Sequence, residues 1–325
     1  MPATPIPGNQ YTLAVGKQTA KGAAAATALY KLKATGGSLR PNRTKLQLAE
    51  TDATRQDGLT VVTGAHIEGS PTFYLRPSDA GLLFLLALGT DVVTGAGPYT
   101  HTITAAASPP YATWWKNLGA NAIIDKYFDC VINSLHITGG ANQVLAITPE
   151  IYGLNALMNT TDVGNAVVTE VPYTYAEVVV TKDGATPGTV ESFDITITSN
   201  GAPIFGDSGL FPPAVAWSKL QVTGTLNLLF ENRTDYENFH TGTAAGAALT
   251  TTVRPEALIL TLTRDANTSI VMTMAGVSYT DYTVDSNVDG SPYRAVAAFH
   301  AEPQTTLAGY FTAVVKNNVS SYPGA

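Results

Sequence analysis

The chain has 325 residues, of which 45% are apolar and only 13% are charged. This composition excludes a disordered chain, because disorder requires low hydrophobicity and high net charge. The single cysteine, Cys130, excludes an internal disulfide framework and argues against a cysteine-ligated metal site. The net charge of −7 argues against a protein that grips nucleic-acid phosphates, since such a protein needs a basic face.

Charged and apolar residues are unevenly spread along the chain. Residues 1–49 hold seven Lys and Arg and no acid, whereas residues 161–325 hold 16 Asp and Glu against seven Lys and Arg. The longest apolar run, Leu82–Leu88, is far shorter than the about 20 residues of a transmembrane helix. The opening residues, MPATPIPGNQ, lack the charged and apolar segments of an export signal. We therefore expect a cytosolic product with no membrane span.

Strand and turn formers dominate, with 45 Thr, 29 Gly and 19 Pro, and they predict a mainly β fold. An amino-terminal basic arm is expected over residues 1–34, with one short strand at Tyr11–Val15. Two repeats are expected over residues 35–153 and 175–320, joined by a linker over residues 154–174. The arm should be attracted to the acidic half, either by folding back over its own subunit or by bridging to the next ring of an assembly.

In the first repeat, a strand at Ala65–Leu75 leads into a helix at Asp79–Leu88. Ser78 is the expected N-cap and Gly89 the expected end of that helix. A hairpin, Phe128–Thr138 with Gln143–Tyr152, follows with period-2 alternation of apolar residues.

In the second repeat, a strand at Leu220–Phe230 leads into a helix at Asp235–His240, with Thr234 as its N-cap and an end near Gly242. The hairpin that follows is Ala257–Thr263 with Ile270–Val277. Gly69 and Gly224 occupy matching places in the two repeats, which favours an internal duplication. Further strands are expected at Tyr99–Thr104, Tyr175–Val180, Phe193–Thr198 and Ala295–Ala301.

The segment Gly206-Asp207-Ser208-Gly209 matches the nucleophile segment of trypsin-like serine proteases, whose chemistry needs a histidine base beside the serine. None of the five histidines lies in a recognisable base motif, so we interpret the segment as a loop. Asp285–Gly290 matches half of a calcium loop, but Val296 stands where the bidentate Glu belongs, which favours a plain turn.

Trp114-Trp115 would suit stacking on a sugar or a base, but the neighbouring Pro-Pro-Tyr favours packing under a loop or at a subunit contact. Cys130 lies in an alternating strand and is expected to be a small buried hydrophobe. We therefore expect no enzyme activity and no catalytic, cofactor-binding or metal-binding residues.

Several segments resemble the tail tube, or major tail, proteins of long-tailed bacteriophages. The resemblance covers roughly residues 35–320 and rests on the strand–helix–hairpin pattern of both repeats. The segments are GSPTFYLRPSDAGLLFLLALGT (Gly69–Thr90), YTHTIT (Tyr99–Thr104), FDCVINSLHITGGANQVLAITPEIYG (Phe128–Gly153), VESFDITITSNGAPIFG (Val190–Gly206) and GTLNLLFENRTDYENF (Gly224–Phe239).

The resemblance implies two tandem β-sandwich or half-barrel repeats, each with one short outer helix, that assemble into a closed β-barrel ring. Stacked rings would form the tail conduit through which DNA passes into the host without specific binding. The implied partners are other copies of the chain and the tape measure, tail terminator and distal tail proteins. The implied location is the virion tail, after assembly in the host cytoplasm. Neither a cofactor nor an enzyme activity is implied.

Tubes of this family present six tube domains per ring, so two repeats per chain imply three chains in a pseudo-sixfold ring. A single elaborated tube domain would imply six chains instead. An alternative function is a β-sandwich binding module, such as an adhesin or glycan binder, with Trp114-Trp115 and the turn at Asp285 as its site. That class normally carries an export signal. A hydrolase built on Ser208 is a third, weaker alternative.

Overall fold

The computed structural model describes residues 8–50, 58–119, 123–207, 209–231, 233–251, 253–285 and 289–322. Strands dominate these residues, as the composition predicts. Ser208 and positions 286–288, which the motif analysis singled out, lie outside the described residues. No helix among the described residues is long and apolar enough to cross a membrane.

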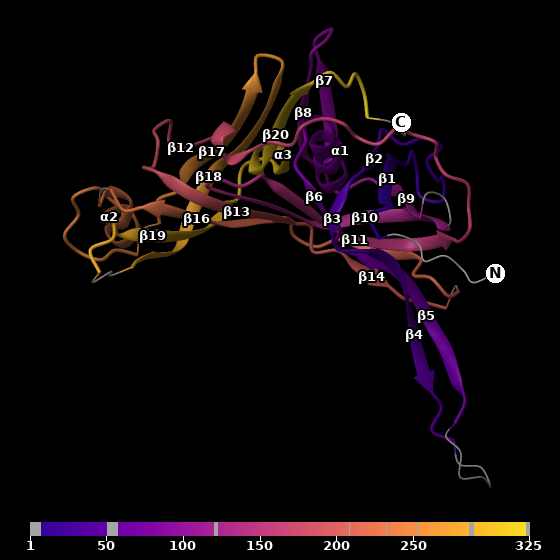
Figure 1. Ribbon diagram of the computed structural model, residues 1–325. Coiled ribbons are helices and arrows are strands. Elements are labelled where there is room, and N and C mark those ends of the chain that lie inside the picture. The colour runs from indigo at the N-terminus through magenta and orange to yellow at the C-terminus, as the bar shows by residue number, and fades with distance from the viewer. Residues whose placement is uncertain are drawn as a thin grey trace.

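A continuous antiparallel sheet, here named the lower sheet, forms one layer of the body (Figure 1). Its strand order is β11–β10–β13–β16–β19, followed by the second half of β18. It joins the two predicted repeats, because β10 and β13 pair directly from Ser134↔Thr198 to Gly140↔Ser192. The bounds are β10 Ile123–Gly140, β11 Ala146–Leu157, β13 Val190–Thr198, β16 Gln221–Leu229, β18 Thr268–Val284 and β19 Arg294–Ala301.

A second antiparallel sheet, the upper sheet, lies across the core from the first (Figure 1). Its order is β12–β17–β18–β20–β8–β7. The long strand β18 belongs to both sheets: its first half pairs with β17 and β20, and its second half pairs with β19. The bounds are β7 Gly89–Thr94, β8 Tyr99–Ala105, β12 Val178–Lys182, β17 Glu256–Asp265 and β20 Thr312–Asn317.

The amino-terminal segment is part of the body. The strand expected at Tyr11–Val15 is present as β1 (Tyr11–Lys17), which pairs with β2 (Lys31–Leu32) on one side and with β9 (Ala112–Leu118) on the other. Leu13 and Val15 are buried in the core. Residues 8–34 therefore fold back over their own subunit, and β9 links them to the first half of β10.

A hairpin projects from the body (Figure 1). It consists of β4 (Leu39–Gln47) and β5 (Thr60–Gly69), and only its base is anchored, where β5 pairs with β11. The single strand expected at Ala65–Leu75 is divided into β5 and β6, because Ser70-Pro71 interrupts the strand between them. The small strands around this base are β3 Ala34–Gly36 with β6 Thr72–Tyr74, and β14 Ala202–Ile204 with β15 Ala214–Ala216.

Helix α1 (Pro77–Leu88) lies between the two sheets and all of its residues are buried. The expectation of an outer helix is therefore wrong for the first repeat. The run LLFLLAL has no polar side, and a helix that is apolar all round is driven into a core. Ser78 is not the N-cap, because the helix begins at Pro77, one residue before it. The Ser78 hydroxyl donates to Glu170 instead. Gly89 ends the helix as predicted, with a φ of 118°.

Helix α2 (Thr234–Thr241) begins at the residue expected to be its cap and ends before Gly242, whose φ of 72° suits a helix terminator. A third helix, α3 (Leu307–Tyr310), was not expected from the sequence. The segment predicted as a strand from Tyr175 begins as a 3-10 turn over Tyr175–Glu177 and becomes strand only at Val178. The expected strand Leu220–Phe230 is present as β16, and Gln143–Tyr152 overlaps β11, which begins only at Ala146. The other expected strands lie within β8, β10, β13, β17, β18 and β19.

Burial of α1 places one carboxyl group in an unfavourable position. Asp79, in the first turn, is 4% exposed, and neither of its carboxylate oxygens has a hydrogen-bond partner among the described residues. Burial, and then the nearby Glu170, raise the pKa of Asp79 to about 7. Ionisation of this carboxyl is therefore more costly in the folded protein than in the unfolded chain.

This raised pKa predicts a pH-dependent effect of Asp79→Asn. The unfolded carboxyl ionises near 3.8 and the folded one near 7, so folding stability is lost as the pH rises between these values. We compare the free energy of unfolding of the variant with that of the wild type at each pH. This difference should rise in favour of the variant by up to about 4 kcal/mol from about pH 4 to about pH 8. Urea unfolding at both pH values measures this gain. An equal effect of the substitution at both would contradict the prediction.

Candidate functional site

The lower sheet has one buried face and one polar face. Strand alternation buries residues such as Ile137, Ile195 and Leu226 against the core. The opposite side, here named the polar face, is rich in hydroxyl-bearing residues. Its members are Ser134, His136 and Thr138; Ser192, Asp194, Thr196 and Thr198; Gln221, Thr223, Thr225 and Asn227; Val296, Ala298 and His300; and Asp281 and Thr283.

Strand register arranges these side chains in rows across the sheet. His136 lies opposite Thr196, which lies opposite Thr223, which in turn lies opposite His300. A neighbouring row runs from Thr138 through Asp194 and Thr225 to Ala298. The polar face is thus continuous over both halves of the chain, because the β10–β13 ladder joins them.

The polar face carries the carboxylates of Asp194 and Asp281, and no lysine is among the residues named above. Arg294, which begins β19, follows the same alternation and is exposed, and its Nε lies 2.6 Å from Oε2 of Glu191. Nε2 of His136 lies 2.7 Å from Oδ2 of Asp194, and both side chains are partly exposed. Nε2 of His300 lies 3.0 Å from Oε1 of Glu302 at the edge of the face. A surface of this kind offers hydroxyls and negative charge, and its arginine is already paired with a carboxylate, so few cations are free to hold phosphate groups.

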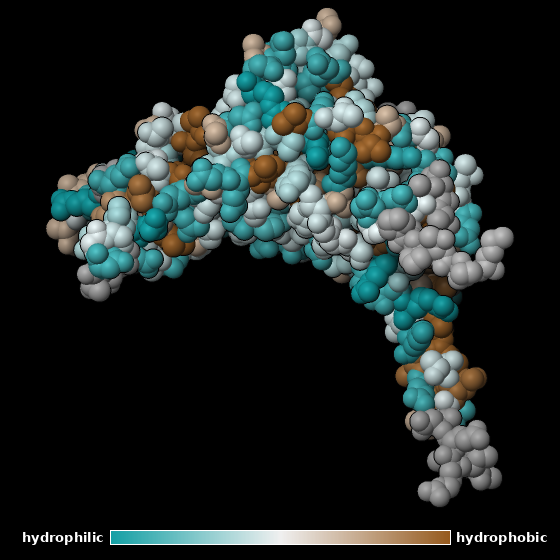
Figure 2. Space-filling model, in the orientation of Figure 1, coloured by the Kyte–Doolittle hydropathy of each residue, from teal (hydrophilic) through white to brown (hydrophobic). Residues whose placement is uncertain are grey.

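The projecting β4–β5 hairpin is a second exposed surface of different character. It carries Arg43 and Lys45 on β4, and the apolar side chains of Leu46 and Leu59 are 53% and 71% exposed. Figure 2 shows apolar side chains along its length. Among the described residues β4 pairs only with β5, so its outer edge presents unpaired backbone groups. Exposed apolar groups and a free strand edge are typical of a surface that contacts another protein chain.

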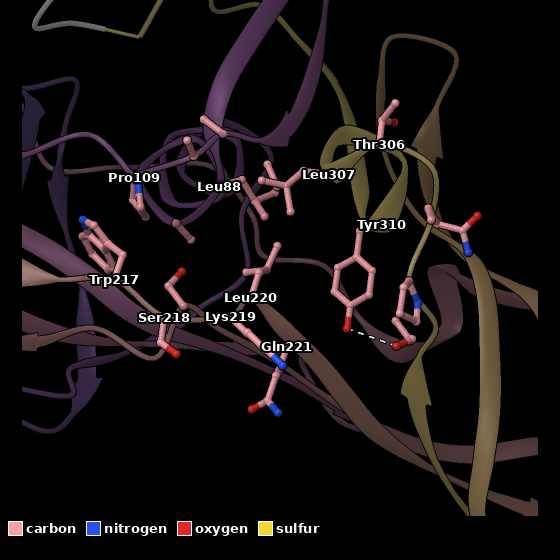
Figure 3. Close-up of a pocket in the computed structure, with 18 of the residues that line it drawn as sticks. Leu88, Pro109, Trp217, Ser218, Lys219, Leu220, Gln221, Thr306, Leu307 and Tyr310 are labelled. Carbon is pink, nitrogen blue, oxygen red and sulfur yellow. Dashed lines mark hydrogen bonds between the residues drawn. The ribbon is translucent and has the colours of Figure 1, made fainter.

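A cavity of about 690 Å³ lies between the end of α1, the start of β16 and α3 (Figure 3). Its walls include Leu88, Trp217, Leu220 and Leu307. Tyr310 extends across one side, where its hydroxyl donates to the carbonyl oxygen of Ala301 at 3.0 Å. These mostly apolar walls suit packing contacts more than proton transfer.

The histidines are dispersed over the molecule. His66, His101, His136 and His300 each face a different acidic residue, and the ring of His240 packs against Tyr236. Among the described residues, no group of His, Cys, Asp and Glu is arranged to hold a metal ion.

Trp114, Trp115 and Cys130 are buried, as expected. Trp114 and Trp115 lie in β9, and Nζ of Lys126 lies 5.2 Å from the centre of the Trp115 ring. Neither indole is available to stack on a ligand, so the packing interpretation is confirmed. Burial raises the pKa of the Cys130 thiol well above its usual value, which suits an unreactive core residue.

Comparison with protein families gives one finding that bears on these surfaces. The model of a family described as phage tail tube protein matches residues 8–289, which is most of the chain. A search of curated proteins finds no match.

The charge of the polar face predicts how it responds to added cations. Thr196 and Thr223 are opposed on β13 and β16, so the double substitution Thr196→Lys with Thr223→Lys places two cations at its centre. We expect this variant to bind duplex DNA, with an affinity that falls steeply as salt increases, because lysines release counterions from phosphates. The wild type should bind far more weakly.

Fluorescence anisotropy of a labelled duplex at low and at physiological salt measures this difference. The matched control replaces the same two threonines with glutamine, which preserves polarity and adds no charge. Equal DNA binding by the wild type and the lysine variant would contradict the prediction.

Proposed function

Because the chain belongs to the phage tail tube protein family and therefore has a structural role in the virion tail, we propose that its polar face lines the lumen of a tube of stacked rings. The observation that carries this proposal is the continuous polar face, with its hydroxyls, its carboxylates and its scarcity of cations, since Arg294 at its edge is paired with Glu191. Carboxylates repel DNA phosphates, and few cations are free there to hold them. DNA therefore slides through the tube without specific binding.

Ring closure requires several chains. Among the described residues, the strand ladders form an open, branched set and do not close within one chain. A lumen for duplex DNA is wider than barrels of about 16–18 strands, which leave only an aqueous channel. The closed barrel is therefore an assembly of several copies, each contributing its lower sheet.

Two tandem tube repeats, over residues 35–153 and 175–320, are our proposed division of the chain. Each contains an antiparallel strand pair, β4–β5 or β13–β16, that precedes a helix. Gly69 and Gly224 lie in the second strands of these pairs. A Cβ at Gly69 would collide with the carbonyl oxygen of Ser38, just before β4, and one at Gly224 with that of Asp194 in β13. The helices differ, since α1 is buried and α2 is half-exposed.

Two repeats per chain predict rings of three chains with pseudo-sixfold symmetry. Native mass spectrometry of single rings, released from tubes by mild denaturant, gives the number of chains directly. Three chains per ring is the expected result. Six chains would favour the alternative of one elaborated tube domain per chain.

We propose that the β4–β5 hairpin, and not residues 1–34, bridges neighbouring rings. It combines basic residues with exposed Leu46 and Leu59, and acidic residues predominate in the second half of the chain. The amino-terminal segment is less suited to this role because β1 already pairs with β2 and β9 of its own subunit.

A shortened hairpin tests this assignment. Replacing residues 44–64 with Asn-Gly keeps the Arg43↔Ala65 pair next to a two-residue turn, so the body should fold normally. We expect wild-type circular dichroism but no tubes in electron micrographs, because the contact between rings is lost. Deletion of residues 8–17 is the comparison, and it should destabilise the subunit itself by removing β1. Normal tubes from the shortened chain would contradict the assignment.

The remaining proposals follow from family membership. The chain acts without catalysis, and its partners are other copies and the tape measure, tail terminator and distal tail proteins, with assembly in the host cytoplasm. The alternative of a glycan-binding module has no support from Trp114-Trp115, because both side chains are buried.

A further inference from the structure

One lysine and two acidic side chains form a buried cluster at the outer end of the upper sheet. Lys182 ends β12, Asp235 lies in the first turn of α2, and Glu256 begins β17. The side chains of Lys182, Asp235 and Glu256 are 8%, 12% and 5% exposed. Nζ of Lys182 contacts Oδ1 of Asp235 and lies 2.9 Å from Oε2 of Glu256. The proposed function in a tube does not depend on this cluster.

The surroundings of this cluster are aromatic and fix the orientation of Glu256. The ring centre of Tyr279 lies 5.5 Å from Nζ of Lys182. Burial, and then the negative charge of Asp235, raise the pKa of Tyr279. Asn238 donates to Oε1 of Glu256 at 3.3 Å, and Nε of Arg254 lies 3.7 Å from the same oxygen. The other oxygen, Oε2, therefore faces the lysine.

Burial of these charges is costly in itself. One ammonium and two carboxylates have been removed from water, and the Coulomb attraction within such a group often fails to offset the loss of hydration. Conversion of the Lys182–Asp235 pair into a neutral amide would remove two of the three buried charges. The geometry favours that reaction, because the amine and the carboxyl are held together and a proton carrier is in contact with the amine.

We propose that Lys182 and Asp235 form an intramolecular isopeptide bond, with Glu256 as the catalytic proton carrier. Glu256 accepts a proton from the lysine ammonium, and the neutral amine attacks Cγ of Asp235. Glu256 passes that first proton to one carboxylate oxygen of Asp235. It then transfers a second proton from the nitrogen to the same oxygen. The Cγ–O bond then breaks, water leaves and the amide remains. Ammonium and carboxylate thus give amide and water, with no oxidant or reductant, and Glu256 returns to its starting state.

The bond would tie the end of β12 to the start of α2, across 53 positions of sequence. Both elements lie at the outer end of the molecule, away from the projecting hairpin (Figure 1). A covalent link of this kind resists local unfolding of α2 because it restricts the unfolded chain. This inference is independent of the proposed tube function.

The chain contains a matched control. Lys31 and Asp162 also form a contacting ion pair, but each side chain is 15% exposed. The Lys31 and Asn117 side chains lower the pKa of Asp162 against the opposing effect of burial, which is the largest influence. Among the described residues, Lys31 has no second carboxylate within ion-pair distance. This pair should stay ionic.

Intact mass spectrometry of the denatured full-length protein is the test. The wild type should weigh less than its sequence by one water molecule, and a tryptic digest should contain a branched peptide that joins Lys182 to Asp235. Lys182→Arg and Glu256→Gln should each restore the full mass, whereas Lys31→Arg should keep the deficit. The digest of the wild type decides the matter even if a variant fails to fold.

Three results would overturn the proposal. The first is a wild type of full mass whose Lys182 and Asp235 lie in separate, unmodified peptides. The second is a deficit that survives Lys182→Arg, because the lost water would then come from elsewhere. The third is a folded Glu256→Gln variant that still forms the bond at the wild-type rate, which would remove Glu256 from the reaction.

Discussion

Burial of α1 is the constraint on which the rest of this structure depends. A helix whose apolar residues leave no polar side must be covered on all sides, and a single sheet covers only one. The lower sheet covers it through β10, and the upper sheet through β8 and β20. The long strand β18 joins these layers, so the two halves of the chain share one core.

The same packing creates the surface assigned to function. Because the lower sheet turns its apolar side chains toward the core, its alternate residues point away and form the polar face. Hydroxyl groups on that face keep it hydrated without attracting phosphates. The sheet edges and the projecting hairpin, which the subunit does not cover, are the places where other chains are expected to attach.

Part of this fold could be predicted from sequence alone. Alternating residues revealed β10, β11, β17 and β18, and Gly89 and Gly242 ended their helices as expected. The cap of α1 could not be predicted, because Glu170 reaches the helix start from 92 positions away. The division of the Ala65–Leu75 segment had a local signal, Ser70-Pro71, since proline cannot donate to a ladder.

The functional surfaces were less accessible to sequence reasoning. Rows such as His136, Thr196, Thr223 and His300 depend on strand register, which pairs residues distant in sequence. The cluster of Lys182, Asp235 and Glu256 likewise has no characteristic spacing, because three separate elements bring it together. The family resemblance indicated a tube, and the proposal of a lumen face rests on the three-dimensional arrangement of the lower sheet.

Electron cryomicroscopy of the polymerised protein is the most direct test of the claim that the polar face lines the tube. In a reconstruction of the tube wall, β10, β13, β16 and β19 should form its inner surface, with Thr196 and Thr223 directed toward the axis and α1 enclosed within the wall. A map in which these strands face outward, or are covered by a neighbouring ring, would contradict the account.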